Sequence, residues 1–457
     1  AAVGNSNVVF TVTDSTGQIA SGSVLFAIHP RTDILSVNNS TPPTPGSGTS
    51  STPSISNDGR LVAFVSSASL LSSGGVGTQI YVHDWQTNQT TLISRSGITP
   101  SPTGGNGASS APSISGDGRF VAFVSGAPDL LPAGSPAITG QQIYVYDRQL
   151  GVTSLVSRDN AGNAASGGSV IGSPSISGNG RFIAFVTDAN LGATGQQIYL
   201  RDTQGSGLFP NGQTLVISKD NTPVPGNGNS AAPSISSDGC FVAFASSSTN
   251  LGAPANQTYV RGPLAVAGCA GTEQTTLVSK DNSSNPASAG SNSRKPSVSG
   301  DGRFVAFISD ATNLGATGQQ VYLHDTQVSG LFPNGQTILI SKDNTTPIQV
   351  AGNSSSDTPS ISDDGCFVAF TSSATNLGAP ANQIHIRGPL AIAGCVGTEQ
   401  TDLVSKDSSG NPANGVAGST VNPSANGNGQ LIAFSSSATN LITPSPGNTQ
   451  IYVRALP

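Results

Sequence analysis

Four cysteines are the residues of this chain whose type and spacing point most clearly to chemistry. They form two pairs with the same separation of 29 residues, Cys240 with Cys269 and Cys366 with Cys395 in order along the chain. A zinc site favours short Cys-x-x-Cys spacing, so we expect disulfides and no bound metal. Spacing alone leaves open which cysteine bonds to which.

No catalytic constellation emerges from the other residue types. The chain has four histidines, His29, His83, His324 and His385. His83 and His324 share one position of an internal repeat, where other copies carry Tyr or Arg, and such a variable position is expected on a solvated strand face. The chain has no G-x-S-x-G turn, and its acidic residues are dispersed over repeated turns and strand ends. We therefore expect no enzyme and no cofactor.

The composition excludes several classes of protein. Only 9% of the 457 residues are charged, against about 25% in an ordinary soluble domain, and the net charge is −6. A nucleic-acid-binding protein needs a clustered basic face, and no apolar run approaches the ~18 residues of a membrane span. The sequence starts at Ala1 and contains no Met, from which we expect a secreted protein whose signal peptide has been removed.

Internal repeats indicate the architecture that must position these residues. A Pro-Ser pair followed by a hydrophobic run recurs with Pro53, Pro112, Pro174, Pro233, Pro296, Pro359 and Pro423, which is typical of a repeat architecture. Each copy contains short β-branched and aromatic runs bounded by Gly, Asn, Asp or Pro. An Asp-Gly or Asn-Gly pair between the first two runs favours a tight hairpin. The pattern predicts an all-β fold, a seven-bladed β-propeller of four-stranded antiparallel blades.

The repeat also resembles a known family. The strings S-x-D-G-R-F-V-A-F-x-S, A-x-N-L, Q-I-Y-V-x-D and T-x-L-V-S are similar to the PD40 (TolB-like, WD40-like) propeller repeat over about residues 51–454. This resemblance implies the propeller fold and a secreted or periplasmic setting. It implies no particular reaction, because propellers host many unrelated functions.

The last repeat lacks a fourth strand, because the sequence ends soon after QIYVRA (450–455). The segment TDILSVNN (32–39) matches the missing strand, so we expect an N-terminal strand to close the ring in the last blade and remove an exposed sheet edge. The chain is thereby divided into an N-terminal β extension, residues 1–30, and a propeller, residues 31–457. Six apolar residues of the extension are candidates for contacts between subunits: Val8, Phe10, Val12, Leu25, Phe26 and Ile28.

The repeats covary at one corner of each blade. Where the residue after the hairpin turn is Arg, the third strand ends in Asp, and where it is Cys, that strand ends in Gly. Covarying positions indicate contact, which predicts the ion pairs Arg60–Asp84, Arg119–Asp147, Arg181–Asp202 and Arg303–Asp325. The first turn and the third–fourth loop of an antiparallel blade lie on one face, so the same geometry pairs Cys240 with Cys269 and Cys366 with Cys395.

The polar loops offer candidate glycosylation sites. N-x-S/T sequons occur at Asn38, Asn39, Asn88, Asn256, Asn282, Asn344 and Asn353. Lys-Asp-Asn triplets at 219–221, 280–282 and 342–344 follow the fourth strand, where we expect them to fix the loop rather than to bind a ligand. Loops this polar are not expected to form an apolar ligand pocket.

The sequence is compatible with three functions. We favour a secreted, non-enzymatic structural or surface-assembly protein, such as the subunit of an extracellular filament, that associates with itself or with another surface protein. The alternatives are an extracellular module that binds peptides or glycans at the channel mouth, and a hydrolase. All three rest on analogy at the level of the fold.

Overall fold

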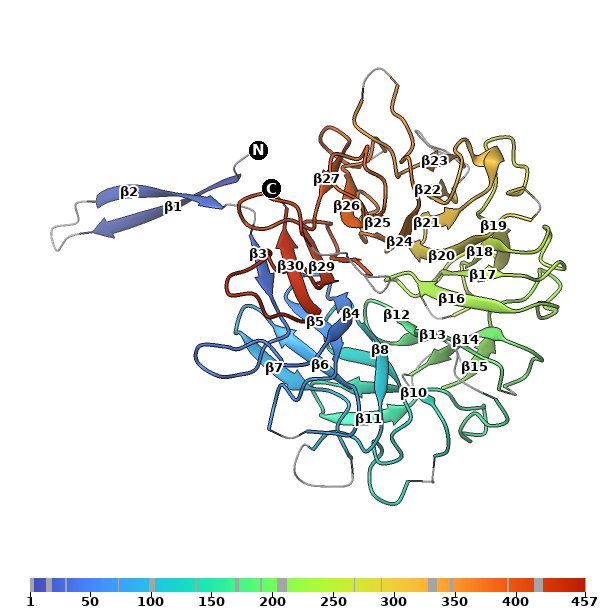
Figure 1. Cartoon of the computed structure of the whole chain (residues 1–457). Coiled ribbons are helices and arrows are strands. Elements are labelled where there is room, and N and C mark those ends of the chain that lie inside the picture. Colours follow the sequence, from blue (N-terminus) through green and yellow to red (C-terminus); the bar gives the residue numbers. More distant parts are fainter. Residues whose placement is uncertain are drawn as a thin grey trace.

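The described residues of this computed structural model lie between 4 and 456. Residues 14–18, 29–30, 73, 98–102, 136–137, 169–171, 190, 204–211, 267, 289, 328–334, 346–347, 393 and 415–421 are left out, and for 4–13 and 19–28 only the backbone is described. The chain forms seven four-stranded sheets arranged as a ring and one two-stranded hairpin outside it (Figure 1). The prediction of a seven-bladed β-propeller is therefore confirmed.

Each blade corresponds to one sequence repeat, and its first strand faces the channel (Figure 1). Blade 1 contains β4 (Ser50–Ile55), β5 (Leu61–Ser66), β6 (Gln79–Asp84) and β7 (Gln89–Leu92). Blade 2 contains β8 (Ser109–Ile114), β9 (Phe120–Ser125), β10 (Gln142–Asp147) and β11 (Val152–Leu155). Blade 3 contains β12 (Ser175–Ile176), β13 (Phe182–Thr187), β14 (Gln197–Asp202) and β15 (Thr214–Val216).

The remaining blades repeat this order. Blade 4 contains β16 (Ser230–Ile235), β17 (Val242–Ser246), β18 (Gln257–Gly262) and β19 (Gln274–Leu277). Blade 5 contains β20 (Ser293–Val298), β21 (Phe304–Ser309), the 3-10 turn η1 (Thr312–Leu314), β22 (Gln320–Asp325) and β23 (Thr337–Leu339). Blade 6 contains β24 (Ser356–Ile361), β25 (Val368–Ser372), β26 (Gln383–Gly388) and β27 (Gln400–Leu403). Blade 7 contains β28 (Ser424–Ala425), β29 (Leu431–Ser436), β30 (Gln450–Ala455) and β3 (Thr32–Ile34).

The ring is closed by the N-terminal strand, as predicted. Strand β3 is the outermost strand of blade 7, where Asp33 lies opposite Val453 and Ile34 opposite Tyr452. The backbone N–H of Leu35 extends the pairing by donating to the carbonyl of Ile451 at 2.8 Å. In Figure 1 the blue β3 lies directly beside the red β30. The two ends of the propeller sequence are thereby held in one sheet.

The core is built from one repeated aromatic pair per blade. A Phe of the second strand packs against a Tyr of the third, as in Phe64–Tyr81 and Phe434–Tyr452, with ring centroids 6.1 and 5.7 Å apart. In blade 6 the second partner is His385, whose ring lies 5.8 Å from that of Phe370. These side chains are fully buried, so apolar burial between and within blades is the main stabilising term.

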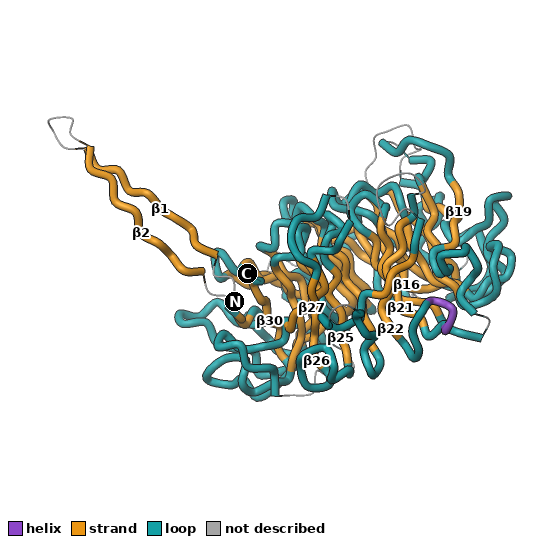
Figure 2. The backbone as a smooth tube through the Cα atoms, turned by 90° about the horizontal axis from the view of Figure 1, so that it is seen from above, coloured by secondary structure: helices purple, strands orange, loops and turns teal. Residues whose placement is uncertain are grey.

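The N-terminal extension forms the hairpin of β1 (Gly4–Thr13) and β2 (Ile19–Ile28), in register from Gly4↔Ile28 to Thr13↔Ile19. It projects away from the rim of the ring (Figure 2). The apolar residues predicted to contact another subunit belong to these strands, and their side chains lie outside the described part of the structure. A contact with a second subunit stays a prediction. Among the described residues, no helix has the length and apolar character needed to cross a membrane.

Candidate functional site

The two faces of the ring differ in construction. We call the face that carries the turns between first and second strands the closed face, and the opposite face the open face. At the closed face the residue two positions after each first strand forms part of an axial ring: Asn57, Gly116, Gly178, Ser237, Gly300, Asp363 and Gly427. Backbone hydrogen bonds link neighbouring blades here, for example Asn57 N to Gly116 O at 3.0 Å and Gly300 N to Asp363 O at 2.9 Å. The blades are therefore tied together next to the channel axis.

Three side chains fill the centre of this axial ring. The carboxylate of Asp363 accepts a hydrogen bond from Ser237 Oγ at 2.6 Å and another from Asn57 Nδ2, so it bridges blades 6, 4 and 1. The other four positions are glycines, and a Cβ at Gly116 would approach Asn57 Nδ2 to 2.7 Å. Side chains thus occupy the axis at the closed face, and a ligand must enter the channel from the open face.

Burial raises the pKa of Asp363 above its ordinary value, although the hydrogen bonds from Ser237 and Asn57 act in the opposite direction. The nearby carboxylates of Asp364 and Asp301 raise it further. The carboxylate therefore carries an electrostatic cost in the folded protein when it is ionised. Asp363 therefore has a structural role on the axis. Nothing in the sequence distinguishes it from the residues of the other repeated turns.

The open face contains a cavity of about 360 Å³ at the mouth of the channel. It is lined by the first strands of blades 4 to 6 and by neighbouring segments: Gly172, Ser173, Gln196, Ala231, Ala232, Pro233, Lys295, Pro296, Thr358, Pro359, Asn422 and Pro423. The only charged side chain among these lining residues is that of Lys295. The mouth is thus lined by apolar and uncharged polar groups and by one ammonium group, that of Lys295.

Lys295 is positioned by an irregularity in its strand. The pairing of β20 with β21 shifts register between Arg294 and Ser297, and Lys295 has a left-handed φ of 51°. Its ammonium lies 2.9 and 2.8 Å from the two carboxylate oxygens of Asp357 on β24. Both side chains are accessible, at 44% and 37% exposure. Register shifts of this kind redirect side chains near functional sites.

The same left-handed conformation recurs at the residue before proline in four other blades, at Thr52, Ala111, Ala232 and Thr358. The irregularity is therefore part of the repeat, whereas the Lys–Asp pair occurs in blades 5 and 6 alone. The sequence pattern predicted the strands but singled out neither Lys295 nor Asp357. A signal was available in this charge-poor chain, because the two residues before the repeated Pro are uncharged in every copy except Arg294-Lys295 and Asp357-Thr358.

The four predicted ion pairs lie at the corners of the closed face. Their shortest N–O distances are 2.6 Å for Arg60–Asp84 and for Arg119–Asp147, 2.8 Å for Arg181–Asp202 and 3.0 Å for Arg303–Asp325. Burial acts to raise the pKa of Asp84, but the hydrogen bonds from Arg60 and Thr87 outweigh it and lower the pKa to about 2. The hydrogen bond from Arg119 likewise lowers the pKa of Asp147, so the carboxylates of Asp84 and Asp147 stay ionised at neutral pH and hold their corners.

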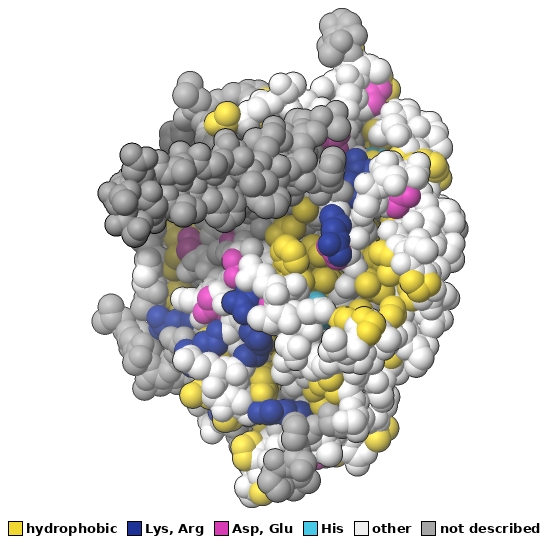
Figure 3. Space-filling view, turned by 90° about the vertical axis from the view of Figure 1, so that its left-hand side faces the viewer, with side chains coloured by type: hydrophobic (Ala, Val, Ile, Leu, Met, Phe, Trp, Pro, Cys, Tyr) yellow, Lys and Arg dark blue, Asp and Glu magenta, His cyan; other side chains and the backbone are white. Residues whose placement is uncertain are grey.

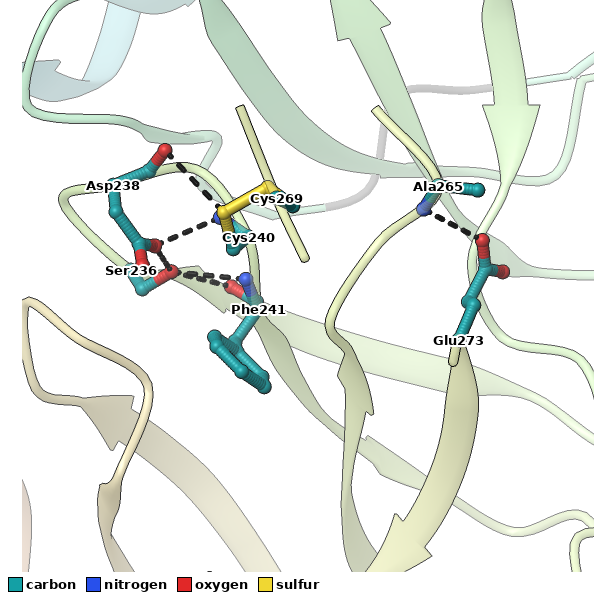
Figure 4. Close-up of a disulfide and its surroundings, with 7 residues drawn as sticks. All are labelled: Ser236, Asp238, Cys240, Phe241, Ala265, Cys269 and Glu273. Atoms are coloured by element: carbon teal, nitrogen blue, oxygen red, sulfur yellow. Dashed lines mark hydrogen bonds between the residues drawn. A yellow bond between two sulfur atoms is a disulfide. The ribbon is translucent and has the colours of Figure 1, made fainter. Parts of the chain in front are cut away.

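Disulfides replace the ion pair in blades 4 and 6. Cys240 bonds to Cys269 and Cys366 to Cys395, with Cα atoms 5.5 Å apart in both pairs. Figure 4 shows Cys240 directly after the turn, where its N–H donates to Asp238 Oδ1 at 2.8 Å. The loop that carries the second cysteine is held in turn by Glu273, which accepts a hydrogen bond from the N–H of Ala265 at 3.0 Å (Figure 4). Two disulfides indicate an oxidising compartment, extracellular or periplasmic.

The expectation that His83 and His324 lie on a solvated strand face is wrong. Each is 1% exposed, and its Nδ1 lies 2.9 or 3.0 Å from the hydroxyl of Thr90 or Thr337. Burial lowers the pKa of His83 to about 4 and that of His324 to about 3. The reason is that the fourth strand and the loop of the preceding blade cover this position, which the repeat pattern alone does not show.

The same position carries a buried arginine in blades 3, 4, 6 and 7, and loop carbonyls of the preceding blade accept hydrogen bonds from it. Arg387 is fully buried; its Nη1 donates to Thr401 Oγ1 at 2.6 Å and to Lys342 O at 3.1 Å, and its Nε donates to Glu399 at 2.7 Å. The position is therefore a joint between blades. It takes His, Tyr or Arg because each can bond to the same hydroxyl or carbonyl groups or pack against them.

The Lys-Asp-Asn triplets belong to the same joints. Asn344 donates to Thr401 O at 2.8 Å and accepts from Thr401 N at 2.7 Å, and Asn221 and Asn282 accept from Thr275 N and Thr337 N. Asn39 makes the corresponding bonds to Thr90.

The seven candidate glycosylation residues lie in different surroundings. Three of them, Asn39, Asn282 and Asn344, hold blades together through the bonds just described. Asn353 bonds to Thr375, and the other three are exposed or half-buried loop residues, namely Asn38, Asn88 and Asn256. Glycosylation stays a prediction at all seven.

Charge elsewhere on the surface is sparse. Figure 3, which views the ring from the side of the hairpin, shows Lys and Arg in small groups beside Asp and Glu, separated by uncharged surface. Within the described part of the chain, no three His, Cys, Asp or Glu side chains are grouped so that they could hold a metal ion.

Solved structures with a similar fold give the wider context. An oligogalacturonate lyase in complex with manganese has a TM-score of 0.54 and 12% identity, with 100% of this chain and 98% of that chain covered. An oligogalacturonate lyase from Vibrio parahaemolyticus has a TM-score of 0.50 and 11% identity, with 100% and 99% covered. A TolB from Agrobacterium tumefaciens has a TM-score of 0.34 and 16% identity, with 68% and 88% covered. No protein-family model matches the sequence, and no curated protein matches it.

These comparisons correct two expectations. We expected a non-enzymatic structural or filament subunit, and hence no enzyme, on analogy at the level of the fold. The similar structures that span the whole chain are enzymes, so the same level of comparison contradicts both expectations. Motifs along the sequence could not reveal the grouping at the mouth, because Lys295 and Asp357 belong to different repeats and meet only in the folded ring. The PD40 resemblance is supported as far as the seven-bladed propeller.

Proposed function

We propose that this chain is an enzyme of an oxidising compartment that acts on an acidic oligosaccharide at the open-face mouth of its channel. The observation that carries the proposal is the position of Lys295, which is the only charged residue lining the mouth and is paired with the accessible carboxylate of Asp357. The substrate class is taken from the two lyases of similar fold, which by name act on oligogalacturonate. A carboxylated sugar supplies an anion that can replace the Asp357 carboxylate at the Lys295 ammonium.

The chemistry follows from exchanging one carboxylate for another. When a sugar carboxylate binds the Lys295 ammonium, it displaces Asp357 from the ion pair. The ammonium then stabilises negative charge that develops on the sugar carboxylate, and the released Asp357 carboxylate accepts the proton from the adjacent carbon. The C–O bond at the next carbon breaks, its electron pair leaves with the oxygen, and solvent protonates that oxygen. The product carries a carbon–carbon double bond next to the carboxylate.

The test is turnover of oligogalacturonate by the full chain, followed by ultraviolet absorbance of the unsaturated product and by new reducing ends. Lys295→Met keeps the side-chain length but removes the charge, and we expect it to lower the rate by about 100-fold or more. Lys280→Met, far from the mouth, is the matched control. An inactive wild-type chain, or a fully active Lys295→Met variant with a normal melting temperature, would contradict the proposal. Reducing ends without the ultraviolet signal would show hydrolysis and overturn the elimination.

A further inference from the structure

A second and larger cavity lies on the outer side of blade 7. We call it the seam groove, because it is lined by β3 and by segments of blades 6, 7 and 1 near the point where the ring closes. Its volume is about 790 Å³, within the range of ligand pockets. Its lining includes Arg31, Asp33, Trp85, Asn88, Asp407, Ser409 and Thr443.

Trp85 is the only tryptophan of the chain, and it lines this groove. Its Nε1 donates to the carbonyl of Gly59 at 2.7 Å. The residue at the same repeat position makes the same bond in other blades without an indole, since Arg148 donates to Gly118 O at 2.7 Å and Thr326 to Gly302 O at 3.2 Å. The hydrogen bond therefore requires a donor but not a tryptophan. The ring of Trp85 packs with one part against the core between blades 7 and 1 and is only partly buried, and the bond to Gly59 holds it in a fixed orientation.

The charges in the seam groove are already engaged within the protein. Arg31 pairs with Asp33, with Nε and Oδ1 2.5 Å apart. Asp407 accepts hydrogen bonds from the N–H groups of Ser409 and Asn411, both at 2.8 Å. His83, which also lines the groove, is uncharged at neutral pH because burial lowers its pKa to about 4. Among the lining residues, one arginine and two aspartates leave a sum of −1.

We infer that the seam groove is a binding site for an uncharged oligosaccharide, with Trp85 as its apolar platform and the polar groups of Asn88, Ser409 and Thr443 as partners for sugar hydroxyls. A fixed aromatic ring offers a large apolar face at low entropic cost, and such anchors dominate binding energy. The negative sum disfavours a carboxylated sugar. This site is separate from the proposed catalytic mouth and stands or falls independently of it.

The single tryptophan makes the test direct. Emission under tryptophan-selective excitation is recorded while the full chain is titrated with cellohexaose and with maltohexaose. We expect a saturable change with at least one of these neutral sugars. Ser409→Tyr, which places a ring in the groove opposite Trp85, should weaken that binding about tenfold or more. Ser283→Tyr is the matched control, because Ser283 occupies the same place in the equivalent loop after blade 4, with its N–H bonded to Asp281 Oδ1 at 2.9 Å; it should bind as the wild type does.

Trp85→Phe and Trp85→Leu complete the test, with binding measured by calorimetry. Phe retains an aromatic face and should bind more tightly than Leu, although both lose the bond to Gly59. Equal losses in the two variants would show a structural role for the indole and overturn the inference. No response to the neutral sugars, a response to oligogalacturonate or to a peptide digest alone, or unchanged binding in Ser409→Tyr would overturn it as well. Turnover at the mouth should be the same in all these variants.

Discussion

The closed and open faces of this propeller are made from the same seven repeats but perform different tasks. The closed face contains the disulfides, the Arg–Asp corners and the axial ring that Asp363 bridges. The open face contains a cavity with one accessible ion pair, Lys295–Asp357. This pair links β20 to β24 of the next blade. The corner carboxylates of the closed face are at most 13% exposed and stabilise the ring, whereas Lys295 and Asp357 on the open face are both accessible to a ligand.

In a repeat protein, a functional residue is best sought at a position where one repeat differs from the others and the difference has no structural explanation. The corner position also varies, but an Arg–Asp pair holds the corner in four blades and a disulfide holds it in two. The Lys–Asp pair has no counterpart in the other blades. Substitutions on the closed face should therefore lower stability and spare turnover, and substitutions at the mouth should do the reverse.

The largest loss of stability is expected for Glu399→Ala. Glu399 accepts from Arg387 Nε at 2.7 Å and lies 3.3 Å from Lys342 Nζ, and Arg387 is fully buried. Removing the carboxylate leaves a buried guanidinium without its counter-ion, which should cost about 3–5 kcal/mol. Chemical denaturation measures this loss, with Asp402→Ala on the neighbouring strand as the control. A loss no greater than that of the control would show that the joint does not depend on the ion pair.

Removal of one disulfide ranks next. The double substitution Cys366→Ala with Cys395→Ala releases a loop closed across 29 residues and should lower the free energy of unfolding by about 2–4 kcal/mol. Turnover at the mouth should remain that of the wild type at a temperature where the variant is folded. A loss of turnover in a variant that is still folded would contradict the proposal that the closed face contributes stability alone.

The Arg–Asp corners should differ among themselves. Asp325 is fully buried, whereas Arg60 of the first corner is 42% exposed. Arg303→Ala leaves a buried carboxylate and should cost about 2 kcal/mol, while Arg60→Ala should have little measurable effect because solvent screens the exposed charge. Thermal unfolding of the two variants side by side tests this, and equal effects would contradict the dependence on burial.

The smallest effect, and one of opposite sign, is expected at the axis. Because the folded-state pKa of Asp363 is raised, the folded protein binds its proton more tightly than the unfolded chain, and stability falls as pH rises through that pKa. Asp363→Asn removes this cost and should raise the melting temperature slightly at neutral pH, with less difference in acid. The Asp84 corner behaves oppositely, since its lowered pKa of about 2 gives stability that is lost only as the pH falls towards that value. A melting temperature of Asp363→Asn below that of the wild type at neutral pH would contradict this account of the axis.

Much of the fold follows from local sequence. The Asp-Gly turns, the short β-branched and aromatic runs such as FVAFVS (120–125) and the seven Pro-Ser repeats predicted the blades, and the strand-like segment 32–39 predicted closure of the ring. Covariation predicted the corner contacts, because residues in contact at a repeated corner must change together. Most of these features depend on interactions within one blade, and the sequence repeats the residues that make them in several copies.

The candidate site was much less predictable. Lys295 and Asp357 lie 62 residues apart, and they meet only because neighbouring first strands converge on the axis. Burial at the blade joints was missed for a related reason: His83 looks solvated in its own repeat, but Thr90 and the loop of the preceding blade cover it. Contacts between blades are set by the curvature of the ring, which no single repeat encodes in its pattern.

The most direct test of the functional account is a structure of the Asp357→Asn variant with oligogalacturonate. This substitution removes the proposed proton acceptor and frees Lys295 from its ion pair, so substrate should bind without turnover. We expect a sugar carboxylate within hydrogen-bond distance of Lys295 Nζ, inside the open-face cavity and short of the axial ring. Sugar bound on the closed face or in the seam groove, or a mouth that stays empty at saturating substrate, would contradict the account.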